Sequence, residues 1–251
     1  MKIVVLKFGG TSVGNIDRIK KVAKIIASYK RKKLNVIVVS SAMSGTTNDL
    51  IRKTEELSNN FDSAEYDVLL SSGEQAACAL IAGRLKHLGL KARSWMSWQL
   101  PIITEGPYSA SRISKINKTK ILTFMKTGGI PIITGFQGIN LDSRITTLGR
   151  GGTDASAIML AKFFNADACD IYTDVDGVYT TDPRIVPEAR RLDQVSFEEM
   201  LELASLGAKV LQTRSVELAM RFNVRLRVLS SFEDPSDTAG TLVCAEEEIM
   251  E

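Results

Sequence analysis

The sequence predicts an α/β fold of three layers, an αβα sandwich in which helices cover both faces of a mainly parallel central sheet. Continuous apolar runs rich in β-branched residues, such as 34–40, are typical of buried strands. They alternate with stretches such as 16–31, where apolar residues recur at helical spacing. Because strands joined through a helix pair in parallel, this alternation indicates a helix–sheet–helix sandwich.

The elements follow one another along the whole chain. Ser71 to Gly73 should interrupt one long helix, and Gly128 with Gly129 should end another. Residues 135–144 form a hairpin-like excursion, and Ser196 with Glu199 predicts a capping box. The predicted strands are 3–6, 34–40, 90–98, 101–104, 130–134, 167–172, 226–229 and 241–243, and the predicted helices are 16–31, 49–57, 64–87, 115–126, 156–164, 196–206 and 211–221.

Composition narrows the class of protein. The chain has 251 residues, of which 44% are hydrophobic and 24% charged, as in ordinary globular domains. With 32 basic and 29 acidic residues the charge is too balanced to indicate a nucleic-acid or membrane partner. The three scattered cysteines exclude a disulfide framework and a zinc site, and predict buried thiols in a reducing compartment. With no signal peptide and no apolar run of roughly 18 residues, we expect a cytoplasmic protein.

The first fourteen residues, MKIVVLKFGGTSVG, place a lysine and two glycines between a strand and a helix. Such a turn presents backbone N–H groups to phosphate oxygens. The lysine precedes the glycines, unlike in a P-loop, and the glycine spacing does not fit GxGxxG. The alternative is a tight turn with a solvated lysine at Lys7.

Residues 40–48 form a hydroxyl-rich loop at the carboxyl end of the second strand, where open parallel sheets bind ligands. Helix capping explains only one or two of these residues. Glu74 lies in a mostly apolar stretch, so it is either on an exposed helix face or the partner of a cation. Taken alone, its surroundings favour the exposed face.

A second glycine turn, 145–155, carries Arg150 and Asp154. The segment 173–184 that follows holds three aspartates before its end, but it lacks the spacing and closing glutamate of an EF-hand. The only histidine, His87, lies at a predicted helix end, which sets histidine chemistry aside. Cations at glycine turns, together with oriented N–H donors, are the equipment of phosphoryl transfer.

Six motifs, in register from Lys7 to Val243, resemble those of the aspartate kinase family: KFGGTSVG, SSAMSGTTNDL, SGEQ, GRGGTDASA, TDVDGVYTTDPR and GAKVL. That family lies within the amino acid kinase superfamily, beside carbamate, acetylglutamate, glutamate-5 and uridylate kinases. The resemblance implies the carbamate kinase-like fold and a reaction of MgATP with L-aspartate that gives 4-phospho-L-aspartate and ADP. This is the first step toward lysine, threonine, methionine and diaminopimelate. ATP and Mg²⁺ are the implied cofactors.

The resemblance also implies roles for individual residues, with no protein ligand assigned to Mg²⁺. Lys7 and Asp154 would be catalytic, and Glu74 would bind the substrate ammonium instead of lying on an exposed face. The residues implied for phosphate and nucleotide are Lys7, Phe8, Gly9, Gly10, Thr173, Asp174, Tyr179, Arg184 and Lys209. Those implied for aspartate are Ser41, Thr47, Glu74, Arg112, Arg150, Gly151, Gly152 and Thr153.

The implied catalytic domain is 1–245, with an aspartate-binding part to about 145, a nucleotide-binding part from about 146, and a frayed acidic tail, 246–251. Gln212–Thr213 departs from the His–Pro that many relatives have. The regulatory ACT domains of typical aspartate kinases are absent, so we expect a catalytic-only form or a fragment. A homodimer or a separate regulatory subunit is the expected macromolecular partner.

Two other functions stay open from the sequence. One is a sibling kinase that phosphorylates another carboxylate or a phosphate, such as a glutamate-5 or acetylglutamate kinase. Arg150 and Glu74 favour an amino-acid substrate over a nucleotide. The other is a non-catalytic nucleotide-binding subunit, and the presence of Lys7 and Asp154 argues against it.

Overall fold

The computed structural model describes residues 2–208, 210–234 and 239–249. Within these ranges the strands are β1 (Ile3–Phe8), β2 (Asn35–Ser40), β3 (Ala92–Trp95), β4 (Ile102–Glu105), β5 (Arg112–Ile116), β6 (Ile130–Thr134), β7 (Gln137–Ile139), β8 (Ile145–Thr147), β9 (Ala168–Thr173), β10 (Gln194–Ser196), β11 (Leu226–Ser230) and β12 (Thr241–Cys244). The helices are α1 (Ile16–Arg31), α2 (Thr46–Leu57), α3 (Ser63–His87), α4 (Thr119–Lys126), α5 (Gly152–Phe164), α6 (Phe197–Ser205), α7 (Thr213–Phe222) and α8 (Glu246–Ile249).

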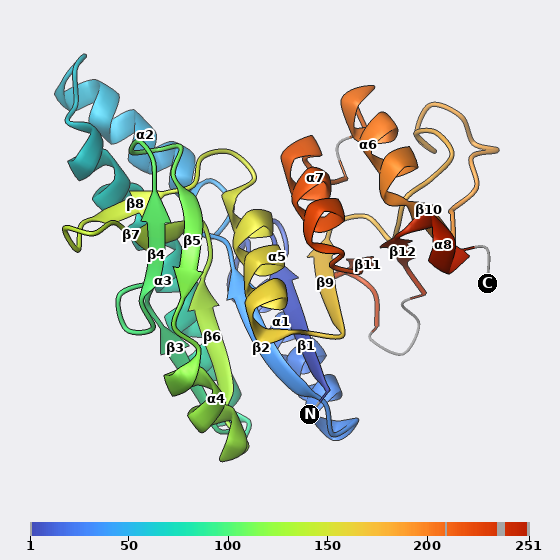
Figure 1. The fold of residues 1–251 in the computed structure, drawn as a ribbon, viewed down its shortest axis with the longest axis horizontal. Helices are drawn as coiled ribbons and strands as arrows, with labels where there is room; N and C mark the ends of the chain where they lie inside the picture. The colour runs from blue at the N-terminus through green and yellow to red at the C-terminus, as the bar shows by residue number, and fades with distance from the viewer. Residues whose placement is uncertain (1, 209, 235–238, 250–251) are drawn as a thin grey trace.

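The central sheet has eight strands in the order β10-β12-β11-β9-β1-β2-β6-β3, with helices on both faces (Figure 1). All its pairings are parallel except that of β11 with β12. The chain builds outward from β1 through β2 and β6 and then returns to the other side with β9. This puts β1 at a topological switch point, where α/β sheets open a crevice at the carboxyl ends of their strands. The predicted three-layer α/β class is confirmed.

Side chains of β1 alternate between the two faces of the sheet. Val4, Leu6 and Phe8 belong to the core under α1 and α3. Ile3 and Val5 belong to the core under α5 and α7. By the same period of two, Lys7 points to the α5 face.

A second sheet of four strands, in the order β5-β4-β7-β8, was not expected as a sheet. The predicted helix 115–126 is wrong over its first four residues: residues 115 and 116 belong to β5, and α4 begins at Thr119. The register of β5 against β4 shifts at Ile103/Thr104, so Ser114 has no directly opposite partner. This bulge turns both Ile113 and Ile116 inward.

Three further expectations need correction. The helix α3 runs without interruption through Ser71 to Gly73, and the Ser71 and Ser72 hydroxyls donate back to carbonyls of the preceding turn at 2.7 Å. Helix α5 begins at Gly152 instead of residue 156, and α2 begins at Thr46 instead of residue 49. The short strand β10 was not predicted, and residues 246–249 of the acidic tail form one helical turn, α8.

Other expectations are confirmed. The capping box of Ser196 and Glu199 is present on α6. The excursion after β6 forms an antiparallel pair of β7 with β8. All three cysteines, Cys78, Cys169 and Cys244, are buried free thiols. No helix in the described ranges is both long enough and apolar enough to cross a bilayer.

Candidate active site

Lys7 and Asp154 form a buried ion pair at the switch point of the sheet. Lys7 lies near the carboxyl end of β1, and Asp154 lies in the first turn of α5. The Lys7 Nζ and Asp154 Oδ1 atoms are 2.7 Å apart, and each side chain is 11% exposed. The contact has ion-pair distance but not regular hydrogen-bond geometry. A Cβ at Gly9 would lie 3.2 Å from Lys7 Nζ, so a side chain there would crowd the ammonium group.

The turn after β1 leaves a row of N–H groups free. The Gly9 N–H donates to the Tyr172 carbonyl at 3.3 Å, so it is engaged within the protein. None of the described hydrogen bonds uses the N–H groups of Gly10, Thr11 or Ser12. Successive free N–H groups form an anion-binding nest. The expected phosphate cradle therefore centres on residues 10–12, beyond Gly9.

A second set of N–H groups lies at the start of α5. Gly149 and Gly151 adopt φ values of +74° and +72°, which favour glycine, and no side chain caps the helix. The Thr153 and Asp154 N–H groups make none of the described hydrogen bonds. A helix N-terminus with free N–H groups attracts anions. Together with Lys7 it can surround a phosphoryl group.

A cavity of about 300 Å³ joins these features. Its walls come from the end of β1 and the turn after it, the loop after β2 with the start of α2, the middle of α3, Phe136, and the turn that leads into the first residues of α5. The residues that line it are Lys7, Gly10, Ser41, Ala42, Met43, Ser44, Gly45, Thr47, Glu74, Phe136, Gly149, Arg150, Gly151, Gly152, Thr153 and Asp154. Nine residues predicted for catalysis or aspartate therefore meet in one place: Lys7, Ser41, Thr47, Glu74, Arg150, Gly151, Gly152, Thr153 and Asp154.

Glu74 lies in the floor of this cavity. Its residue is 4% exposed, so the exposed-face interpretation is wrong. Oε1 accepts the Ala42 N–H at 3.0 Å, while Oε2 is buried without a hydrogen-bond partner among the described residues. Burial raises the pKa of the Glu74 carboxyl to about 7, against the opposing effect of the Ala42 N–H. A buried carboxylate with a free oxygen suits a cationic group of a ligand.

The contact of α3 with the 41–45 loop requires a small residue. A Cβ at Gly73 would lie 2.8 Å from the Ala42 Cβ. Gly73 therefore lets the Ala42 N–H reach Glu74, which gives a packing reason for the glycine in the SGEQ motif. Ala42 lies within the 40–48 loop that was expected from the sequence to bind a ligand, whereas Phe136 was missed, because an apolar lining residue carries no chemical signature.

Arg150 lies exposed at the rim of the cavity, in the turn between Leu148 and α5. This turn rests on Ser109, since a Cβ at Gly149 would lie 2.7 Å from the Ser109 carbonyl oxygen. Ser109 in turn bonds to Asp67 of α3 through its N–H at 2.9 Å and its hydroxyl at 2.7 Å. The buried Asp67 also accepts the N–H and hydroxyl of Thr147 at 2.7 and 2.8 Å. This support for the Arg150 turn was not predicted.

The residues expected for the nucleotide lie on the other side of β1. Thr173 ends β9, and its hydroxyl donates to Asp174 at 3.1 Å. The Tyr179 hydroxyl donates to Asp176, and Arg184 pairs with Asp182 at 2.7 Å on the surface. None of these lines the 300 Å³ cavity. Phe8, also expected here, points away from Lys7 and stacks on Tyr172, and Lys209 lies outside the described residues.

Arg112 does not join the other aspartate candidates. It begins β5, and its side chain faces a second cavity between β5, α5 and α7. The bulge in β5 and the pairing of the small sheet decide this position.

Comparison with known proteins supports a single family. The sequence pattern of the amino acid kinase family matches residues 2–230. An aspartokinase of Rickettsia conorii is 49% identical over all of this chain and 63% of its own length. An aspartokinase of Pseudomonas aeruginosa is 48% identical over all of this chain and 61% of its own. The chain thus spans about three-fifths of the length of these relatives.

Solved structures agree. Aspartate kinase from Synechocystis superposes with a TM-score of 0.85 at 43% identity, over 96% of this chain and 40% of that one. E. coli aspartokinase III in complex with aspartate and ADP superposes with a TM-score of 0.84 at 30% identity, over 97% of this chain and 65% of that one. Carbamate kinase from Giardia lamblia shares the fold, with a TM-score of 0.69 at 13% identity, over 98% of this chain and 99% of that one. The chain belongs to the amino acid kinase family.

Proposed function

We propose that this chain transfers the γ-phosphoryl group of ATP to the β-carboxylate of L-aspartate. The observation that carries the proposal is the 300 Å³ cavity, which holds Glu74, Arg150 and the Lys7–Asp154 pair. A buried carboxylate, an arginine and a lysine complement an ammonium, a carboxylate and a phosphoryl group. The aspartokinases described above, one of them solved with aspartate and ADP, support this substrate.

Substrate binding follows from the charges of the cavity. Glu74 Oε2 accepts the α-ammonium, and the planar Arg150 guanidinium holds the α-carboxylate with two parallel bonds. The Ser41, Thr47 and Thr153 hydroxyls offer the remaining polar contacts. Arg150 and Thr153 come from the part assigned to the nucleotide, so the aspartate site draws on both parts of the chain.

The chemistry needs no general base. A β-carboxyl group with an ordinary pKa of about 3.9 is already ionised at neutral pH. Its oxygen attacks the γ-phosphorus as the bond to the β,γ-bridging oxygen breaks, and ADP leaves. The main obstacle is repulsion between two anions. Lys7, the free N–H groups of Gly10 to Ser12, and the start of α5 supply the opposing charge.

The nucleotide is proposed to lie on the β9 side, beside Thr173, Asp174, Tyr179 and Arg184, with Lys209 as a further candidate. No group of three or more His, Cys, Asp or Glu side chains able to hold a metal occurs in the described residues. We propose that Mg²⁺ arrives with ATP, held mainly by phosphate oxygens and water, because this ion keeps several waters and binds substrate phosphates.

The cellular setting is proposed from the same reaction. The product is an acyl phosphate that opens the route to lysine, threonine, methionine and diaminopimelate. Three buried, free thiols fit a cytoplasmic setting. The proposed macromolecular partner is a second copy of this chain or a separate regulatory subunit. Sedimentation of the purified chain tests the homodimer, and the reaction stands whether or not one forms.

The test is an ADP-release assay with L-aspartate, L-glutamate, N-acetylglutamate and UMP as alternative acceptors. We expect turnover with L-aspartate alone. Hydroxylamine should trap the product as a hydroxamate, because only an acyl phosphate reacts in this way. Turnover with another acceptor but not aspartate contradicts the proposal, as does ATP binding with no turnover.

A further inference from the structure

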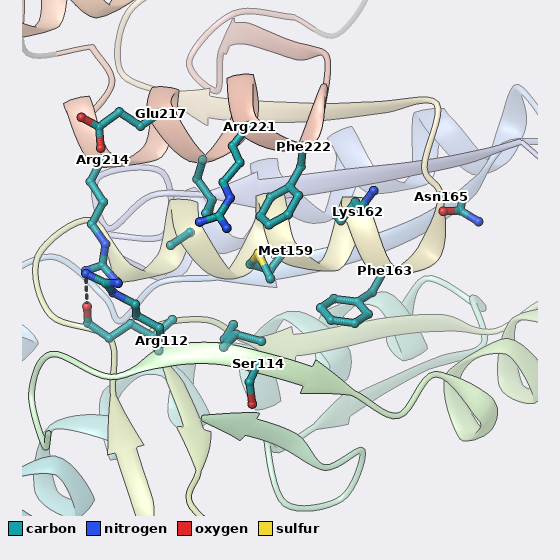
Figure 2. Close-up of a pocket in the computed structure, with 14 residues that line it drawn as sticks. Arg112, Ser114, Met159, Lys162, Phe163, Asn165, Arg214, Glu217, Arg221 and Phe222 are labelled. Carbon is teal, nitrogen blue, oxygen red and sulfur yellow. Dashed lines mark hydrogen bonds between the residues drawn. The ribbon is translucent and has the colours of Figure 1, made fainter. Parts of the chain in front are cut away.

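A second, larger cavity of about 990 Å³ lies between β5, α5 and α7 (Figure 2). Its floor is apolar and is formed by Ile113, Leu148, Met159, Phe163, Leu218 and Phe222. Met159 and Ile113 are buried, while Phe163, Leu218 and Phe222 are half-buried. None of the roles proposed above uses this groove.

Four cations surround the apolar floor: Arg112 from β5, Lys162 from α5, and Arg214 and Arg221 from α7 (Figure 2). No described ion pair gives any of them a carboxylate partner. Arg214 donates to the Leu148 carbonyl at 2.7 Å, the bond marked in Figure 2. The one carboxylate among the described lining residues is that of Glu217.

Lys162 and Arg221 lie over the Phe222 ring, at 5.6 and 5.5 Å from its centre. Cations at this distance from a ring are held beside apolar surface. The groove thus combines an excess of positive charge with an apolar floor, and both are presented by rigid elements.

We propose that this groove binds a small organic anion with an apolar body, such as an aromatic or branched aliphatic group bearing a carboxylate, sulfonate or phosphate. Its volume lies at the upper end of the range of small-molecule sites, roughly 300–1,000 Å³. Its apolar floor is bordered by charged side chains, which suits a ligand that has both an apolar body and an anionic group. The anionic group lies among Arg112, Arg214 and Arg221, and the body packs on Met159 and Phe222. A second copy of this chain fits poorly, because a two-fold contact would set the same cations against one another.

The groove and the 300 Å³ cavity are separate, but α5 and the turn at residues 148–150 connect them. Helix α5 contributes Asp154 to the 300 Å³ cavity and contributes Met159 and Lys162 to the groove. Arg214 holds the Leu148 carbonyl, two residues before Arg150. An occupant that moves Arg214 or α5 changes the position of Arg150, so its binding alters the KM for aspartate. This coupling rests on the proposed function, whereas the binding site itself does not.

The test uses 8-anilinonaphthalene-1-sulfonate, an aromatic sulfonate whose fluorescence rises in apolar sites, titrated into the native chain. We expect one bound probe per chain. The double variant Arg112→Gln/Arg221→Gln should raise its Kd by about tenfold or more, since two charge-assisted contacts are lost. The matched control, Lys24→Gln/Arg31→Gln on α1, removes the same charge far from the groove and should change Kd less than twofold. Near-UV circular dichroism verifies that each variant is native.

Two results would overturn the binding site: an unchanged Kd in the double variant, or equal binding of uncharged N-phenyl-1-naphthylamine. An unchanged aspartate KM at saturating probe overturns the coupling alone. A chain that binds the probe as expected but phosphorylates no acceptor refutes the proposed reaction and leaves the groove site standing.

Discussion

At the scale of single residues, the active-site cavity is governed by two buried charges with different partners. Lys7 has its counter-charge within the protein, in Asp154 at 2.7 Å. Among the residues that the structure describes, Glu74 accepts one N–H, from Ala42, and its Oε2 has no hydrogen-bond partner. A paired charge is stable without ligand, whereas an incompletely paired one is costly to bury. The ligand is therefore expected to complete the environment of Glu74 more than that of Lys7.

Replacing Lys7 by alanine should lower turnover far more than nucleotide affinity. Lys7 opposes the charge that develops on the transferring phosphoryl group, and loss of one such group costs roughly 10²–10³ in kcat. ATP affinity measured by titration should fall less than about tenfold, because residues 10–12 and the β9 side remain. Lys20→Ala, on the exposed face of α1, is the control. Equal losses in turnover and affinity would contradict a transition-state role for Lys7.

Glu74 should make aspartate binding depend on pH. Its pKa is raised to about 7, so the carboxylate that attracts the ammonium forms only as the pH rises through 7. Below that pH the group is neutral, and the KM for aspartate should rise by up to about tenfold per pH unit. Glu74→Gln should have a high KM that is flat between pH 6 and 8. A variant that keeps the pH dependence would assign it to another group.

At the scale of elements, the site depends on how the small sheet and α1 are joined to the main body. Asp67 ties α3 to β8 and to the loop at Ser109 with the hydrogen bonds described above. Arg18 of α1 is 8% exposed and donates through Nη2 to the carbonyl and hydroxyl of Ser231, at 2.6 and 2.8 Å. Neither Asp67 nor Arg18 lines the aspartate cavity. Asp67 supports the turn that carries Arg150, which lines the cavity, and Arg18 holds Ser231 beside the turn after β1, which borders it.

Asp67→Asn should destabilise the fold and weaken aspartate binding. An amide offers one acceptor oxygen where the carboxylate accepts from two N–H groups and two hydroxyls. We expect a loss of about 2–4 kcal/mol in the free energy of unfolding, measured in urea. The KM for aspartate should rise as the turn over Ser109 loosens. Asp142→Asn, on an exposed loop, is the matched control, and equal stability of the two variants would refute the assigned role.

Arg18→Met should weaken the binding of ATP more than the binding of aspartate. The Ser231 hydroxyl that Arg18 contacts also lies 2.8 Å from the Ser12 hydroxyl and 3.0 Å from the Thr173 carbonyl oxygen. Arg18 therefore positions both the free N–H row and the end of β9. We expect the KM for ATP to rise about tenfold with that for aspartate unchanged, because loss of the charged Arg18 donor frees the Ser231 hydroxyl that joins Ser12 to the end of β9. Arg31→Met, at the exposed end of α1, is the control. A parallel rise in both KM values would indicate general loosening instead.

At the scale of the whole molecule, the central position of β1 gathers the site. Its neighbours β2 and β9 end beside it, with Phe8 aligned to Ser40 and Tyr172. The hydroxyl-rich loop follows β2, and the expected nucleotide segment follows β9. Because the chain leaves β1 on one side and returns on the other, the two segments lie on opposite sides of Lys7.

Much of this arrangement was predictable. Buried strands such as β1 and β2 have continuous apolar runs, and the glycine turns stand out by composition. The motifs that carry the family resemblance also contain most residues of the cavity. By contrast, residues 115 and 116 at the end of β5 were assigned to the helix 115–126, because Ile116 was grouped with later apolar residues of that helix and the bulge at Ser114 was not predicted. A bulge depends on the partner strand, so no local pattern reports it.

The sequence by itself determined the three-layer fold, the two glycine turns and the cations beside them, because periodicity and glycine content are local properties. Only the tertiary structure decided where side chains with ambiguous surroundings lie. Glu74, which its neighbours placed on an exposed face, is buried because Gly73 lets α3 approach Ala42. Arg112, grouped with the aspartate residues, faces another groove because the small sheet turns β5 toward α7. Burial and direction arise from contacts between segments distant in the chain, and those contacts exist only once the layers have packed.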